Sequence, residues 1–429
     1  MIKHTIKKLG NGLTYVEAQT KSTEAVTIFI LVGTGVRYET AKDNGISHYL
    51  EHLFFKGTQK RPTPFDVAKE LDSLGANYNA FTGEEYTGFY IQSDARDFPK
   101  AFDILSDMYL NPTFPQSELE SEKNVILEEI KMHRDVPQTH VQRLSQKQIF
   151  GSSALGRDLA GTAQNVKSFT RDEVIEYHKR SYDPANTFVV CCGNPKDFNW
   201  QEEVEKRFSS LKAVAPHKFD AFTGNKVTEK AVCEVRKVDQ AHLVFACLAL
   251  AKNDPRRSSL AILSNILGGG MSSRLFREIR EKRGWAYYVE TGAWALHDTG
   301  MFEVAAGVQE DKVLESAKLI LEQIDDLCQN GPTGEELELA KGNLRGHLSI
   351  GLEDSNDIAE FLAEDLLYFG RVRSIDEIVE GWNKTTKEDI MQLAKDLFQT
   401  DKMGIAVIGP KDYKPELEQL LNNRKAEEK

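Results

Sequence analysis

A repeated stretch of sequence decides how this chain folds. Residues 113–126 read TFPQSELESEKNVI, and residues 333–344 read TGEELELAKGNL. Both contain a Glu-Leu-Glu triplet followed by a lysine, at positions 118–120 and 123 and again at positions 336–338 and 341. The offset between the triplets, 336 − 118 = 218, is about half of the chain length of 429. Such an offset predicts an internal duplication.

Two further pairs of segments repeat in the same order. Gly88-Phe89-Tyr90-Ile91 pairs with Gly300-Met301-Phe302-Glu303, and residues 170–173 (TRDE) pair with residues 386–389 (TKED). We therefore predict two similar domains, residues 1–215 and 225–429, joined within the polar stretch 211–227. The alternative is two unrelated domains whose similarity is due to chance.

Each half combines strands with long amphipathic helices. β-rich apolar runs at 26–32 and 243–250 predict strands, and i, i+3, i+4 spacing at 65–74 and 313–327 predicts helices. Hairpin-like strand pairs alternate with these helices. The pattern predicts an α+β fold in which helices cover a mostly antiparallel sheet in each domain.

Composition excludes several classes of protein. The net charge is 54 − 66 = −12, which argues against a nucleic-acid binder or an anionic-membrane binder. The five cysteines form no CxxC pair and no disulfide framework, and their odd number fits a reducing compartment. The N-terminus lacks the apolar core of a signal peptide, and no apolar run has the length of a membrane helix. We expect a cytoplasmic protein that does not bind membranes.

The strongest chemical signal is His48-Tyr49-Leu50-Glu51-His52. On a helix, which Asn44 or Ser47 could cap, His48 and His52 project from one face and can share a metal ion. Glu51 then lies beside the metal, in the HxxEH order. The alternative is a surface helix with two solvated histidines.

A third metal ligand is expected on another helix, because catalytic zinc usually has three protein ligands. Residues 118–131 read ELESEKNVILEEIK, an acidic helix. Glu122 and Glu129 are seven residues apart and share a face, whereas Glu128 points about 100° away from Glu129. Helical geometry alone leaves open which carboxylate binds the metal and which supports a ligand.

The second half lacks these groups. At the offset of the repeat, Glu122 corresponds to Ala340 and Glu129 to His347. Residues 258–268, the expected counterpart of the HxxEH helix, read SSLAILSNILG. The second half therefore reads as an inactive copy of the first.

Four segments together resemble one family of zinc peptidases. HYLEHLFFKGT, NAFTGEEYTGFY, EKNVILEEI and GRDLAGTAQNV are similar to the pitrilysin, insulin-degrading enzyme and mitochondrial processing peptidase family, and most of all to its short bacterial processing-peptidase branch. The resemblance implies one Zn²⁺ per chain, bound by His48, His52 and Glu129. It also implies that Glu51 is the general base and that Glu122 supports a ligand.

The resemblance assigns two substrate elements as well. Asn79-Ala80-Phe81-Thr82 resembles the family's edge strand, to which an extended peptide adds as a further strand. Arg280 and Tyr287, seven residues apart, resemble the arginine–tyrosine pair that holds the substrate carbonyl and the oxyanion. Arg274 and Arg277 are expected on the surface of a basic helix.

The implied function is a zinc endopeptidase that hydrolyses extended or unstructured peptides in an enclosed chamber. Two chains would enclose the chamber, as a homodimer or as a heterodimer with an inactive paralogue. The alternatives are a non-catalytic or partner subunit, and a zinc hydrolase with a non-peptide substrate. Mn²⁺ and Co²⁺ suit similar ligands.

Overall fold

The computed structural model describes residues 2–20, 23–195, 198–213 and 218–427. The chain forms two compact units, of which the first comprises Met1–Ile130, Arg157–Asp220 and Ser349–Ser374. The second comprises Lys131–Gly156, Ala221–Leu348 and Ile375–Lys429. These units differ from the predicted halves because each half contributes one segment to the other unit. Residues 214–217 of the predicted linker lie outside the described residues.

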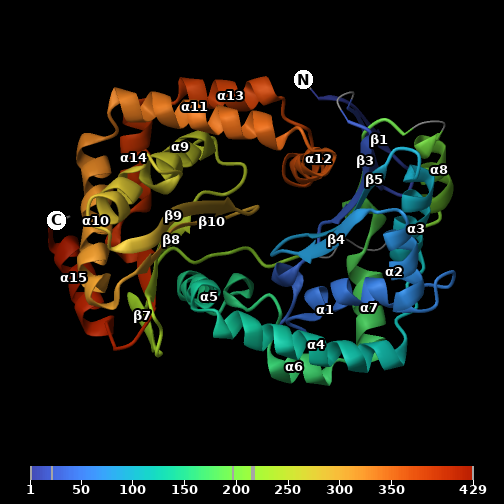
Figure 1. Ribbon diagram of the computed structural model, residues 1–429, viewed down its shortest axis with the longest axis horizontal. Helices are drawn as coiled ribbons and strands as arrows, with labels where there is room; N and C mark the ends of the chain where they lie inside the picture. Colours follow the sequence, from blue (N-terminus) through green and yellow to red (C-terminus); the bar gives the residue numbers. More distant parts are fainter. Residues whose placement is uncertain (1, 21–22, 196–197, 214–217, 428–429) are drawn as a thin grey trace. The chain divides into compact units, whose positions relative to one another are not determined.

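The first unit is built on a six-stranded sheet (Figure 1). In spatial order its strands are β1 (Lys3–Lys8), β2 (Thr14–Gln19), β6 (Thr187–Cys192), β3 (Ala25–Val32), β5 (Thr87–Asp94) and β4 (Asn77–Thr82). Only the β2–β6 pair is parallel. β4 lies at one edge of the sheet and pairs with β5 alone.

The second unit repeats this topology, with no counterpart of β1 among its described residues. Its strands are β7 (Ala231–Val235), β11 (Met403–Gly409), β8 (Ala241–Ala249), β10 (Gly300–Val308) and β9 (Ala286–Ala295). The first pair is again parallel and the others are antiparallel. The predicted α+β fold with mostly antiparallel sheets is therefore confirmed, and the repeated glycine segments 88–91 and 300–303 lie on the equivalent strands β5 and β10.

Helices cover both faces of the first sheet. One face packs against a core that contains residues of α1, α2, α3 and α7, and the other face packs against α12. The helices that begin in this unit are α1 (Ile46–Leu53), α2 (Pro64–Ser73), α3 (Phe98–Leu110), α4 (Gln116–Asp135), α6 (Ala163–Ser168), α7 (Arg171–Ser181), α8 (Trp200–Phe208) and α12 (Ser355–Phe369). Short 3₁₀ turns are η1 (Val36–Tyr38), η2 (Phe54–Lys56) and η4 (Pro184–Asn186).

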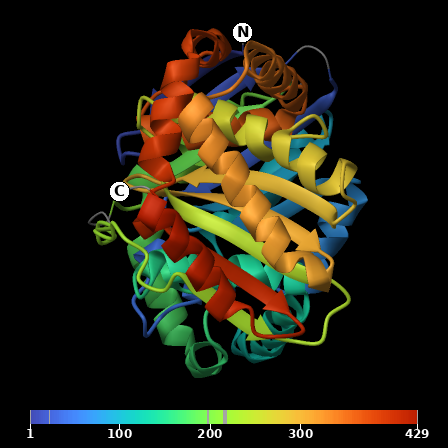
Figure 2. The same ribbon diagram turned by 90° about the vertical axis from the view of Figure 1, so that its left-hand side faces the viewer.

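Figure 2 shows helices of the second unit lying across the near face of its sheet. α9, α10 and α14 cover one face, and α5 covers the other. The helices that begin in this unit are α5 (Pro137–Phe150), α9 (Arg257–Gly268), α10 (Val313–Asn330), α11 (Gly334–Gly351), α13 (Ile375–Lys384), α14 (Lys387–Leu397) and α15 (Lys414–Glu427). Short turns are η3 (Ala154–Gly156), η6 (Glu310–Lys312), η7 (Thr400–Lys402) and η5 (Phe276–Glu281), a π-helix.

One pair of equivalent helices explains why the units differ from contiguous halves. The starts of α5 and α12 are separated by the same offset as the repeated triplets, since 355 − 137 = 218. α12 packs on β3 and β6 of the first sheet, and α5 packs on β11 and β8 of the second. Each sheet therefore buries one apolar face under a helix from the other half of the chain.

The repeat extends to the ends of the helices. α7 and α14 begin with the same capping box, formed by Thr170 with Glu173 and by Thr386 with Asp389. In each box the threonine hydroxyl and the acidic side chain satisfy backbone N–H groups that the helix leaves without a partner. None of the described helices has the length and apolarity to cross a membrane.

Candidate metal centre

The helix that carries His48 and His52 is held from upstream by a buried glutamate. The N-cap of α1 is Gly45, which makes no side-chain cap, so the prediction that Asn44 or Ser47 caps this helix was wrong. Instead, the backbone N–H groups of Gly45 and Ser47 donate to the Glu39 carboxyl at 2.7 and 2.8 Å, and the Asn44 amide donates to it at 3.0 Å. Burial raises the pKa of Glu39 to about 7.

The segment that reads GRDLAGTAQNV supports the same end of α1. Gly45 has φ +98°, and a Cβ there would lie 2.8 Å from the Cα of Gly161. A Cβ on Gly161, which has φ +77°, would lie 2.4 Å from the Asn44 carbonyl oxygen. Asn165 donates to that carbonyl at 3.2 Å, and Asn44 donates to the carbonyl of Asp158 at 3.0 Å. The two glycines therefore permit a close backbone contact that fixes where α1 begins.

Three of the predicted ligands come together around one point. The Nε2 atoms of His48 and His52 lie 3.3 Å apart. The Glu129 carboxylate, from α4, places one oxygen 3.5 Å from His48 Nε2 and the other 3.6 Å from His52 Nε2. Among the described residues, this is the group of histidine and carboxylate side chains arranged to hold a metal ion.

These separations suit zinc. In a tetrahedral site with zinc–ligand bonds of about 2.0–2.2 Å, neighbouring ligand atoms lie about 3.3–3.6 Å apart. The three measured distances fall in this range. Burial lowers the pKa of the His48 imidazole, but the carboxylates of Glu129 and Glu51 outweigh burial, so the net shift is upward. Excess negative charge of this kind favours a cation between the ligands.

Glu122 lies behind His52. Its Oε1 accepts a hydrogen bond of 2.8 Å from His52 Nδ1, so Nε2 is the ring nitrogen left to bind a metal, 3.6 Å from Glu129 Oε2. Its Oε2 pairs with Lys56 Nζ at 2.6 Å. Burial acts to raise the pKa of Glu122, but the hydrogen bonds from His52 and Lys56 lower it below its ordinary value. Glu128, by contrast, is exposed.

Glu51 lies on α1, as the two histidines do, and accepts a hydrogen bond from a residue of β4. Thr82, the last residue of β4, donates its hydroxyl hydrogen to Glu51 Oε2 at 2.7 Å. Burial raises the pKa of Glu51, against the opposing effects of His48 and the Thr82 hydroxyl. Asn79, Ala80 and Phe81 precede Thr82 on this edge strand, in the position that strand addition requires.

In the second unit, Arg280 and Tyr287 lie side by side. The Arg280 guanidinium is 5.6 Å from the centre of the Tyr287 ring and 4.8 Å from that of Phe276. Arg280 belongs to the π-helix η5, and Tyr287 is 73% exposed on β9. The expectation that Arg274 is a surface cation was wrong, because it is largely buried and pairs with Glu336 at 2.7 Å.

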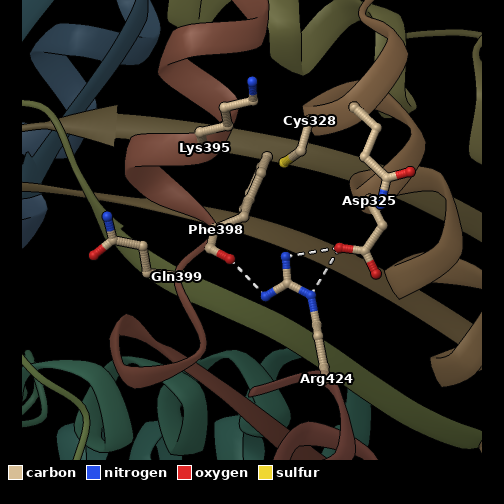
Figure 3. A pocket seen from close by; sticks show the side chains of 7 residues that line it. Asp325, Cys328, Lys395, Phe398, Gln399 and Arg424 are labelled. Atoms are coloured by element: carbon tan, nitrogen blue, oxygen red, sulfur yellow. Dashed lines mark hydrogen bonds and ion pairs between the residues drawn. The ribbon is translucent and has the colours of Figure 1, made fainter. Parts of the chain in front are cut away.

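The second unit lacks the ligands of the first at the equivalent positions. Ala340 replaces Glu122 and is fully buried in α11. A separate pocket of about 380 Å³ lies between α10, α14 and α15 (Figure 3). Its most buried charge, Arg424, is paired with Asp325 at 2.8 Å and donates to the Phe398 carbonyl. This pocket therefore has a structural cation and no metal-binding set among the described residues.

Sequence reasoning missed three residues that position the site. Lys56 follows His52 by four residues within the quoted motif, so helical spacing could have identified it. Thr82 was predicted only as part of a substrate strand. Glu39 gave no signal, because a carboxyl seven residues upstream of Ile46 caps a helix only if the chain folds back.

Comparisons with known proteins agree with this geometry. Residues 15–163 match the family model described as insulinase (peptidase family M16), and residues 168–344 match the model described as peptidase M16 inactive domain. The uncharacterized zinc protease YmxG of Bacillus subtilis is 35% identical over 409 residues, which cover 94% of this chain and 98% of that protein. An uncharacterized zinc protease of Streptomyces coelicolor is 34% identical over 409 residues, covering 94% and 88%.

Two solved structures share the fold. A protease from Helicobacter pylori has a TM-score of 0.87 at 21% identity, over 96% of this chain and all (100%) of that chain. A Pseudomonas fluorescens structure described as a peptidase M16 inactive domain has a TM-score of 0.86 at 19% identity, over 96% and 99%. At these identities the likeness shows the fold alone.

Proposed function

This chain belongs to peptidase family M16, and from that premise we propose that it is a zinc-dependent endopeptidase that hydrolyses extended peptides. The observation that carries the proposal is the arrangement of the His48, His52 and Glu129 ligand atoms, whose separations of 3.3, 3.5 and 3.6 Å fit one tetrahedral zinc ion. We propose one zinc ion per chain, because the second unit has no equivalent set among its described residues.

Bound zinc would polarise the scissile carbonyl and increase the acidity of the attacking water. Glu51 accepts the proton of that water and then delivers it to the leaving amine. Its position one residue before His52 supports this role, because its carboxylate lies on the helix that provides two ligands. Glu122 holds the His52 ring in the orientation that presents Nε2, through the hydrogen bond at Nδ1.

The substrate is an extended peptide segment. β4 is an edge strand next to α1, so a further strand would pair along its outer edge. Within β4 the Ala80 N–H donates to Asn79 Oδ1 at 2.9 Å. Asn79 to Thr82 would provide those groups and would read few of the substrate's side chains. Arg280 and Tyr287 would bind a substrate carbonyl and stabilise the oxyanion. Their proximity to one another on η5 and β9 supports a joint role.

Assembly is part of the proposal. By resemblance to the family, two chains would form a closed peptide chamber, either as a homodimer or as a heterodimer with an inactive paralogue. The competing proposal is that the chain is a partner subunit, which binds zinc and peptide but does not cleave the peptide.

Digestion of a peptide library, read by mass spectrometry with and without a chelator, tests the proposal. We expect cleavage that the chelator abolishes and added zinc restores. Glu51→Gln should keep its zinc and lose turnover, because an amide does not accept the proton. His52→Ala should lower the zinc content measured by elemental analysis. A zinc-loaded wild type that cleaves nothing would instead support the partner-subunit function.

A further inference from the structure

The hydrogen bond between Thr82 and Glu51 joins two parts of the site that come from different elements. Glu51 lies on α1, and Thr82 is the last residue of β4. The Thr82 hydroxyl donates to Oε2 of the carboxylate at 2.7 Å. Within the described part of the chain, this is the hydrogen bond that the Glu51 side chain receives. It engages one carboxylate oxygen, Oε2.

The geometry of β4 directs Thr82 toward α1. Alternate residues of a strand point to the same face, and Tyr78 and Ala80 pack into the core that α1 shares. Thr82 continues this face one step further and meets the carboxylate of Glu51 in place of a core side chain. The intervening Phe81 points to the other face, where it packs into the core beneath α12.

The hairpin that carries Thr82 is anchored independently of the metal ligands. The backbone N–H groups of Val36 and Arg37 donate to the carbonyls of Gly83 and Glu84 at 3.2 and 2.8 Å. Arg37 also pairs with Glu85 at 2.5 Å, and both side chains are fully or almost fully buried. A buried pair of this kind holds its position because separating the charges is costly. The end of β4 is therefore a rigid support.

We propose that Thr82 is a positioning residue for the Glu51 carboxylate. Its hydroxyl fixes Oε2, so Oε1 has one orientation in which to accept the proton of the attacking water. Because Thr82 also ends β4, the same hairpin sets the place of the base and the place of the strand to which the peptide adds. The inference rests on the proposed peptidase function and deepens it.

Three variants separate the hydroxyl from the shape of the side chain. Thr82→Val keeps the β-branched shape and removes the donor, and Thr82→Ser keeps the donor. Thr87→Val is the matched control, because Thr87 is paired with Thr82 across the hairpin and its hydroxyl donates to the Thr34 carbonyl at 3.0 Å, not to Glu51. It removes a buried hydroxyl from the same hairpin and leaves the hydrogen bond from Thr82 to Glu51 in place.

The experiment measures kcat and KM with a fluorescence-quenched peptide that the wild type cleaves. It also measures the zinc content of each protein and determines a crystal structure of each zinc-loaded protein. We expect Thr82→Val to lose kcat by roughly 10- to 100-fold, the cost of a misplaced catalytic group, with KM and zinc content unchanged. Thr82→Ser should recover most of the rate, and Thr87→Val should keep it. The Glu51 carboxylate should move in Thr82→Val alone.

Two results would overturn the inference. One is a Thr82→Val enzyme with wild-type kcat and an unmoved Glu51 carboxylate. The other is an equal loss of kcat in Thr82→Val and Thr87→Val, which would show a general effect of loosening the hairpin. Failure of the peptidase function gives a different result, because the wild type and Glu51→Gln would then be equally inert toward every peptide.

Discussion

His178 should make the metal-free protein lose stability as the pH falls from 7 toward 5. Its ring is partly buried at the end of α7, with its centre 4.9 Å from that of Tyr182, 5.5 Å from Phe114 and 5.6 Å from Phe54. Burial among these rings, and secondarily Lys179, lower its pKa from 6.5 to about 4. The C-terminal end of a helix favours a cation by only about 0.3–1 kcal/mol, so burial wins.

The sign follows from this lowered pKa. A histidine that is harder to protonate in the folded state contributes stability that is complete above pH 6.5 and is lost as the pH falls toward 4. The difference between the two pKa values corresponds to about 3.4 kcal/mol, of which about 2 kcal/mol is lost by pH 5. For units of this size that loss lowers Tm by roughly 4–8 °C.

The wild-type curve alone does not isolate this effect. The pKa of Glu39 is raised by burial to about 7, so its contribution has the opposite sign and grows as the pH falls from 7 toward 4.5. The comparison that isolates His178 is the fall in Tm between pH 7.5 and pH 5.0 in wild type and in His178→Phe. Calorimetry in the presence of a chelator removes the effect of zinc release.

We expect the fall in Tm to be about 4–8 °C smaller in His178→Phe than in wild type. His347→Phe is the matched control, because it makes the same substitution at an exposed position on α11. The Tm of His347→Phe should fall between pH 7.5 and pH 5.0 by as much as that of the wild type. A His178→Phe curve parallel to the wild-type curve would refute the reasoning, and His178→Leu excludes a special effect of the added ring.

Three further outcomes are expected. Glu39→Ala should lower the free energy of unfolding by about 2–3 kcal/mol in chemical denaturation, because it leaves buried N–H groups at the start of α1 without an acceptor. Glu39→Gln keeps an acceptor and should lower it less. Glu129→Gln should reduce zinc content in elemental analysis far more than Glu128→Gln, and equal losses would mean that the ligand is misassigned. If the active sites of a dimer are shared, mixing an Arg280→Ala, Tyr287→Phe variant with Glu51→Gln should restore cleavage. A rate that is only the sum of the two separate rates, after verified subunit exchange, would mean that Arg280 and Tyr287 act within their own chain.

The zinc ligands illustrate what local sequence determines. His48 and His52 share a helix face because 3.6 residues make a turn, and this holds in any tertiary setting. The repeat of the Glu-Leu-Glu segment, the capping threonines of α7 and α14, and the loss of a carboxyl at Ala340 are likewise readable along the chain. These features rest on periodicities that local backbone geometry imposes, so the α+β fold and the HxxEH helix could be predicted from the sequence.

Contacts between distant segments were decided only by the tertiary structure. Glu39 caps α1 because the chain folds back on itself, and Gly45 meets Gly161 because two loops that are far apart in the sequence approach closely. Thr82 reaches Glu51 from a strand 31 residues away. α5 and α12 look like ordinary amphipathic helices in sequence, yet each covers the sheet of the other half. An amphipathic pattern specifies that a face must be buried, whereas the partner that buries it depends on which apolar surfaces the folded chain brings together.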